Sequence, residues 1–162
     1  MSLPLLAAGE FARVIPVLEQ ALKAPTEWIG NHVLYAALAD AGAQQSDEAA
    51  LRKYAPLAET LALRYGHRLY LGVAHRAWGV AHRLAGEYTQ AQARLQAALA
   101  LFQILDTRWQ VGRTLFEMGE CAAAQHQRNV AREYFSAALA SFESLRAAPD
   151  SVRARTALAA LA

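Results

Sequence analysis

Five histidines, one cysteine and a pair of glutamates on one helix are the first residues to consider for catalysis or metal binding. His75 and His82 are seven residues apart, about 10 Å along a helix, which is too far for both to bind one ion without a third element between them. Cys121 has no nearby base or cation of the kind that activates a nucleophile. Glu117 and Glu120 share one helix face but lack a partner carboxylate or a metal motif. We therefore expect partly buried structural histidines, a small core cysteine, a charged helix face and no enzyme.

Three arginines could bind an anion. Arg76 and Arg83 lie two turns apart on one helix stripe, and with Arg113 they could hold a carboxylate or a phosphate through forked hydrogen bonds. The alternative is that each arginine is solvated or paired within the chain, with Glu117 and Glu120 as the nearest carboxylates. The sequence contains no phosphate-binding loop, dinucleotide fingerprint, zinc pattern or serine elbow, so it indicates no cofactor and no metal.

The composition limits the class of protein. Hydrophobic residues make up 55% of the 162 residues and charged residues 19%, which opposes disorder and suits one domain. The net charge of +2 is too small to indicate nucleic-acid binding, and no run approaches the roughly 18 to 20 apolar residues of a membrane span. A single cysteine fits a reducing compartment, and the first residues lack the basic region of a signal peptide. We expect a cytoplasmic protein.

The chain repeats itself with a period of forty residues. Gly79–Leu105 aligns with Gly119–Leu145, and eight of the 27 aligned positions are identical, none of them charged. Repeated small and apolar residues indicate repeated packing, which is typical of a solenoid whose units stack on one another. A bulky residue followed by a small one keeps the same spacing at Leu38-Ala39, Trp78-Gly79, Met118-Gly119 and Leu158-Ala159.

Apolar spacing and turn residues predict eight antiparallel helices. Ser46 or Asp47 is expected to cap the third, Pro56 to kink or break it, and Gly66 and Gly86 to form turns. The predicted helices span about 9–24, 27–43, 47–65, 67–85, 88–105, 107–125, 128–146 and 151–162. We expect one domain over 1–162, a piece of a longer chain, with half-repeat 9–24, repeats 27–65, 67–105 and 107–146, and half-repeat 151–162.

These residues resemble the tetratricopeptide repeat. Trp78-Gly79, Gly86-x-Tyr88, Ala91, Leu95 and Ala98-Leu99 follow its motif. Met118-Gly119, Ala131, Phe135 and Ala138-Leu139 follow it again, although His126 and Arg128 replace the turn glycine and tyrosine. The ordinary repeat has 34 residues. Repeats of about forty resemble those of MalT-like transcription regulators and of bacterial ATPase-linked adenylate cyclases.

The resemblance implies a right-handed α-solenoid in which the first helix of each pair, helix A, lines the concave face and helix B the convex one. It further implies a non-catalytic protein–protein interaction module, the sensor or adaptor arm of a larger bacterial signalling or transcription-regulatory protein. The partner expected is an acidic protein or peptide, with no nucleic acid, membrane or cofactor bound by this region. The expected groove residues are Arg76, Val80, Arg83, Trp109, Arg113, Phe116 and Glu120, with Val73, Val33, Ala36 and Asp40 beside them.

Two other functions compete with peptide binding. A self-associating scaffold would use the apolar stripes of the terminal half-repeats, and a small-molecule sensor would use an enclosed pocket in the concave face. Trp28 and Trp109 lie near helix starts, outside the repeat pattern, and are expected either to anchor a partner at the groove rim or to be covered by the extended helices. The terminal stripes are Phe11, Val14 and Leu18 at one end and Val152, Leu158 and Leu161 at the other.

Overall fold

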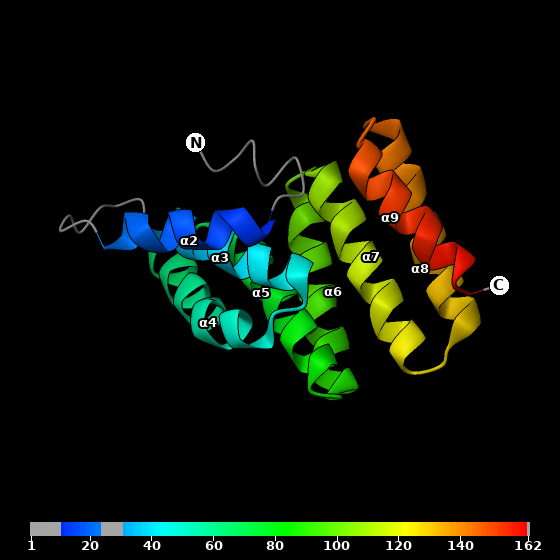
Figure 1. The fold of residues 1–162 in the computed structure, drawn as a ribbon, viewed down its shortest axis with the longest axis horizontal. Helices are drawn as coiled ribbons and strands as arrows, with labels where there is room; N and C mark the ends of the chain where they lie inside the picture. Colours follow the sequence, from blue (N-terminus) through cyan, green and yellow to red (C-terminus); the bar gives the residue numbers. More distant parts are fainter. Residues whose placement is uncertain (1–10, 24–30, 162) are drawn as a thin grey trace.

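The computed structural model describes residues 11–23 and 31–161, and all regular structure within them is α-helical (Figure 1). The expected all-α solenoid of antiparallel helix pairs is confirmed, with eight helices in the described residues. We call α3, α5, α7 and α9 the A helices and α2, α4, α6 and α8 the B helices. The bounds are α2 Phe11–Leu22, α3 Asn31–Gln45, α4 Glu48–Tyr65, α5 Arg68–Leu84, α6 Tyr88–Ile104, α7 Arg108–Ala124, α8 Arg128–Ser144 and α9 Ala148–Ala159.

The turns between helices recur at intervals of 20 residues. In each turn an amide donates to the carbonyl five residues earlier, for example Asp47 N to Gly42 O at 2.9 Å, which satisfies an orphan carbonyl at the helix end. Asp47 also caps α4, because its Oδ1 accepts from Ala50 N at 3.0 Å. Each turn contains one residue with positive φ: Ser46, Gly66, Gly86, Asp106, His126 and Arg146. Only two of the six are glycine, so the other four occupy the left-handed region at a cost.

Glycines on the A helices let their B partners approach closely. A Cβ atom added at Gly79 would lie 2.6 Å from Leu95 Cγ, and one at Gly119 would lie 2.6 Å from the Phe135 ring. Gly72 and Gly112 stand in the same relation to phenylalanine rings of α6 and α8. Four of the alanines that the repeats share on their B helices are fully buried, as expected for close helix contacts: Ala91, Ala98, Ala131 and Ala138.

Two predictions about helix boundaries need adjustment, and a third falls outside the described residues. Pro56 does not interrupt α4, which runs continuously from Glu48 to Tyr65. The last helix begins at Ala148 and takes Pro149 into its first turn, where a missing amide donor costs nothing. Trp28 lies outside the described residues, as do the side chains of Phe11 and Val14.

The terminal apolar stripes are largely covered. Leu18 is buried, and Leu158 and Leu161 pack against the hydrophobic cluster of α7 and α8. Val152, with 59% of its surface accessible, is the exposed member of the stripe on α9. In the described residues Leu18 is thus covered, Leu158 and Leu161 are half-buried and Val152 is open, and self-association through the ends stays a prediction.

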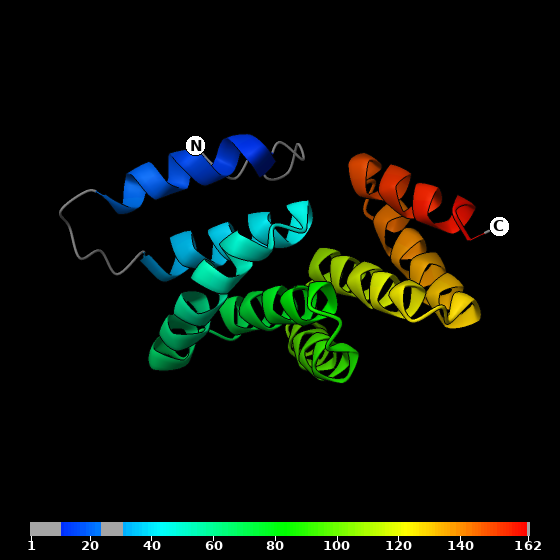
Figure 2. The ribbon, with the colours of Figure 1, turned by 60° about the horizontal axis from the view of Figure 1, so that its bottom comes forward.

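The helices follow an arc in which α5 and α6 lie between the α2–α4 group and the α7–α9 group (Figures 1 and 2). Each helix packs against the next in the chain, and successive A helices also contact one another from α3 to α5 and from α5 to α7. The A helices bring their polar side chains together along this second set of contacts.

Candidate functional site

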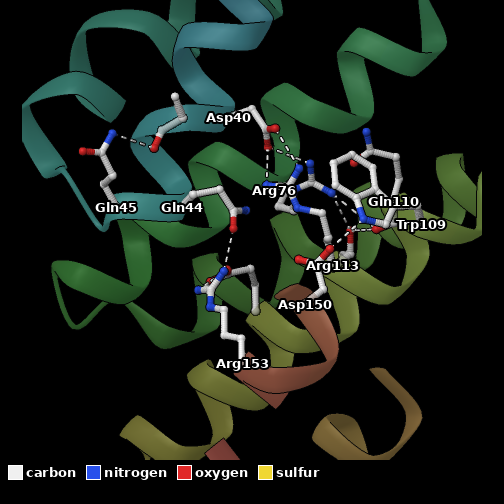
Figure 3. A network of polar contacts seen from close by, with 12 residues as sticks. Asp40, Gln44, Gln45, Arg76, Trp109, Gln110, Arg113, Asp150 and Arg153 are labelled. Atoms are coloured by element: carbon white, nitrogen blue, oxygen red, sulfur yellow. Dashed lines mark hydrogen bonds and ion pairs between the residues drawn. The ribbon is translucent and has the colours of Figure 1, made fainter. Parts of the chain in front are cut away.

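A buried ion cluster joins three A helices. Asp40 of α3 accepts from Arg76 Nη2 of α5 at 2.8 Å, and from Arg113 Nη1 and Nη2 of α7 at 2.8 and 2.9 Å (Figure 3). Arg76 is 0% exposed and Arg113 is 3% exposed. Arg76 Nη1 also donates to Gln110 O at 3.3 Å and to Thr114 Oγ1 at 3.4 Å. We call the surface of the A helices around this cluster the inner face.

The cluster shifts the pKa values of its members. Burial alone would raise the pKa of the Asp40 carboxyl, but the charges and hydrogen bonds of Arg113 and Arg76 hold it below its ordinary value. Burial and the neighbouring charge of Arg113 lower the pKa of Arg76 to about 10, against the opposing effect of Asp40. Asp40 and Arg76 therefore remain charged at neutral pH. Arg76 also lies over the Phe102 ring at 5.2 Å, and Arg113 over the Trp109 ring at 4.6 Å.

The buried cluster corrects the expectation of an open basic strip. Arg76, Val80, Arg113 and Phe116 were expected to line an accessible groove, but all four are buried. Two of the three arginines are paired with one carboxylate of the same chain, so they are not free to receive a ligand in this conformation. Asp40 is the counter-ion that the sequence interpretation did not assign.

A second set of ion pairs lies beside the first. Glu117 of α7 is 1% exposed and lies between Arg83 Nη2 of α5 and Arg153 Nη2 of α9, each at 3.4 Å. Glu117 is therefore a buried counter-ion of Arg83, which is the pairing within the chain that the sequence left open as the alternative to ligand binding. Arg83 also approaches Glu120 at 4.0 Å, and burial together with Glu117 raises the pKa of the Glu120 carboxyl.

Four residues at the edge of the inner face keep some access to solvent, and we call them the rim. The accessible fraction of the side chain is 35% for Glu120 and 37% for Arg153, whereas Arg83 is mostly covered. Trp109, the fourth member, is half-buried and donates from Nε1 to Asp150 Oδ2 at 2.8 Å. Of the further groove positions, Val33 is exposed, Ala36 and Val73 are buried, and Asp40 belongs to the ion cluster.

The histidines and the cysteine have structural contacts. His75 lies 2.8 Å from Arg94 Nη1, and burial and the Arg94 charge lower its pKa. His82 stacks on Trp78 with a centroid separation of 5.7 Å. Cys121 is buried in a small cluster, and burial raises the pKa of its thiol. Across residues 11–23 and 31–161, no three His, Cys, Asp or Glu residues are grouped so as to hold a metal ion.

The space beneath Arg153 on the inner face is closed. The space bounded by Gln44, Arg113, Phe116, Phe142, Asp150 and Arg153 leaves no room for a water molecule. A hollow of about 260 Å³ lies elsewhere, beside the α6–α7 turn, and is lined by Gln103, Asp106, Arg108, Val111 and Ser141. None of the described helices has the length and apolar character needed to cross a membrane.

Comparison with known proteins agrees with the fold. A comparison with curated proteins gave no match for this chain. A family model does match the part of the chain that contains the close glycine contacts, from the start of α5 to the end of α8. Residues 69–144, two complete helix pairs, are thus similar to the tetratricopeptide repeat.

Proposed function

We propose that this chain is a non-catalytic protein–protein interaction module that binds a protein segment at the rim of its inner face. Repeats of this family typically mediate protein–protein interaction and are generally non-catalytic. We further propose that the module is a sensor or adaptor arm of a larger bacterial signalling or transcription-regulatory protein, as the forty-residue period suggests. The buried ion cluster then fixes the curvature of the inner face, and the rim contacts the partner.

The observation that carries this proposal is that the A helices and the B helices contribute different kinds of side chain. The B helices present buried alanine, leucine and phenylalanine to the A helices. The A helices contribute charged groups to a single inner surface, which reaches from Asp40 on α3 to Arg153 on α9. An apolar core does not need this concentration of charge, because buried ion pairs contribute little net stability compared with apolar packing.

The rim defines the chemistry of the partner. Arg153 can bind an acidic side chain, and Glu120 can bind a basic side chain or a hydrogen-bond donor. The half-buried Trp109 ring can make an apolar contact. The accessible surface is therefore of mixed charge, and the proposed partner is an amphiphilic segment in which an acidic and a basic residue flank an apolar one. The closed space beneath Arg153 gives no support to small-molecule sensing at that point of the inner face.

Charge reversal at the rim tests the proposal. Peptides selected from a random library displayed on phage would be titrated against the chain by fluorescence anisotropy. Glu120→Lys is expected to weaken binding about tenfold, because it replaces an attractive contact with a repulsive one. Glu133→Lys is the matched control, since Glu133 lies exposed on the B helix α8. Equal weakening by both variants would overturn the proposal.

Arg83 is a poor choice for this test. Its guanidinium neutralises the buried Glu117, so Arg83→Glu would place two carboxylates together in a dry environment. Charge reversal there is expected to destabilise the fold, and a loss of binding would have two explanations. Glu120 avoids this difficulty, because its closest basic contact is at 4.0 Å and its side chain reaches solvent.

A further inference from the structure

The last A helix, α9, reaches back to the first one, α3, across the inner face (Figure 3). Arg153 Nη1 of α9 donates to Gln44 Oε1 of α3 at 2.5 Å, although the two residues are 109 positions apart. The same guanidinium lies 4.2 Å from the centre of the Phe116 ring and 3.4 Å from Glu117 Oε1, both on α7. Arg153 therefore connects α9 to α3 and lies over Phe116 of α7 between them.

The two sides of α9 are held by different forces. On one side Ala154, Leu158 and Leu161 pack into a hydrophobic cluster whose described members all lie between Trp109 and Leu161. On the other side α9 contacts α3 through the hydrogen bond between Arg153 and Gln44. Within the described residues, α9 is thus anchored to α7 and α8 by apolar packing and is connected to α3 by polar contact.

The polar connection to α3 is weakly held. Arg153 keeps 37% of its side chain accessible, so water competes for its hydrogen bonds. Gln44 Nε2 is buried without a hydrogen-bond partner when its oxygen accepts from Arg153, and so is Arg113 Nε below it. These two unsatisfied buried donors oppose the closed arrangement, because Gln44 Nε2 and Arg113 Nε can form hydrogen bonds with water when the face opens.

Closure covers the residues that would otherwise form the floor of a groove. Arg113 and Phe116 line the space beneath Arg153, together with Gln44 and Asp150, and this space has no room for a water molecule. A partner cannot reach Arg113 or Phe116 unless α9 moves. We propose that α9 is a strap that closes the inner face, and that opening of the strap regulates binding at the rim and floor of this face. The binding consequence rests on the proposed function.

A strap of this kind makes a quantitative prediction. If the partner binds the open form alone, its apparent affinity is reduced by the fraction of molecules that are open. Any substitution that changes the opening equilibrium then changes the apparent affinity by the same factor. A hydrogen bond to a charged group is strong enough to change this equilibrium by about tenfold.

Two substitutions should move the equilibrium in opposite directions. Arg153→Ala removes the contact with Gln44 and Glu117 and is expected to increase opening about tenfold. Gln44→Glu gives Arg153 a carboxylate partner and removes the unsatisfied amide donor, so it should decrease opening. Arg155→Ala is the matched control, because Arg155 lies on the same helix and loses the same charge but pairs with Glu143 of α8.

Trp109 reports on opening without any binding partner. Its Nε1 donates to Asp150 Oδ2 on α9 at 2.8 Å, so movement of α9 away from α7 breaks this bond. Fluorine NMR of the chain carrying 5-fluorotryptophan would follow this residue, with its resonance assigned by its loss in Trp109→Phe. Hydrogen exchange at α9 amides would measure the same motion independently. The phage-selected peptide then provides the binding readout.

The expected result is faster exchange at α9 and a shifted Trp109 resonance in Arg153→Ala, with the reverse in Gln44→Glu. Peptide affinity is compared in Gln44→Glu, where it should fall as opening decreases, because Arg153 itself belongs to the rim. The strap proposal would be overturned if Arg153→Ala and Arg155→Ala showed the same Trp109 resonance and the same exchange rates at the α9 amides. Reduced opening in Gln44→Glu without any loss of affinity would overturn its regulatory role. Failure of the proposed function alone looks different: the structural readouts respond as expected, while Glu120→Lys and Glu133→Lys weaken the peptide equally.

Discussion

Replacing Asp40 by alanine should be the most damaging change of a single charge in the described part of the chain. The substitution removes three hydrogen bonds of 2.8 to 2.9 Å and leaves Arg76 and Arg113 buried without their carboxylate. Removing one partner of a buried ion pair costs about 3–5 kcal/mol. With a urea dependence of about 2 kcal/mol per molar, the unfolding midpoint should fall by about 1.5–2.5 M.

Urea titration followed by circular dichroism measures this effect. Glu143→Ala is the control, because Glu143 forms an exposed ion pair with Arg155 and should cost about 0–1 kcal/mol. The triple variant Asp40→Leu, Arg76→Met, Arg113→Leu should recover most of the loss, since an apolar cluster avoids the burial of charge. Equal midpoints for Asp40→Ala and Glu143→Ala would refute the reasoning.

The same carboxylate makes stability depend on pH. Because the folded protein holds the pKa of Asp40 below its ordinary value of 3.8, the ionised carboxylate stabilises the fold at pH values above that value. This contribution is lost as the pH falls through the lower pKa of the folded state. The difference in stability between wild type and Asp40→Asn should therefore narrow at acidic pH. A difference that stays constant from pH 7 to pH 2 would contradict this.

Four further substitutions test the packing and the turns, each by its urea midpoint. Ala98→Leu should overpack a fully buried contact and cost about 1–3 kcal/mol, and an unchanged midpoint would argue against close stacking. Gly119→Ala should be destabilising despite its gain in helix propensity, because the new Cβ atom meets the buried Phe135 ring at 2.6 Å; a stabilised variant would contradict the contact. His126→Gly should stabilise by about 0.5–1 kcal/mol, because φ is 60° there, and Gly86→Ala should have the opposite effect. If His126→Gly and Gly86→Ala changed the stability in the same direction, this explanation of the turns would be refuted.

The helix order follows from local and periodic features of the sequence. The small residues at Gly79 and Gly119 mark the close A–B contacts, and the turn signals at Gly66 and Gly86 mark the helix ends. These features act between neighbouring elements, so a period of forty residues is enough to predict them. Residue type alone does not identify every turn, because His126 adopts the same positive-φ conformation as the turn glycines.

The contents of the inner face could not be predicted in this way. Asp40 and Arg113 meet across two repeats, and Gln44 and Arg153 across three, so these contacts depend on the curvature of the whole stack. A repeat alignment also places Asp40 at a different position of the unit from its arginine partners. One signal was available: Asp40 is the only acidic residue in α3, an alanine-rich helix without a basic residue that could pair with it.

Mapping a bound peptide by NMR tests the central claim most directly. A phage-selected peptide would be titrated into the chain labelled with nitrogen-15, with shift changes assigned along the backbone. The largest chemical-shift changes are expected on the A helices around the rim, at Trp109, Glu120 and Arg153. Changes concentrated on the outer surface of the B helices, around Glu133, would contradict the claim that the inner face binds the partner.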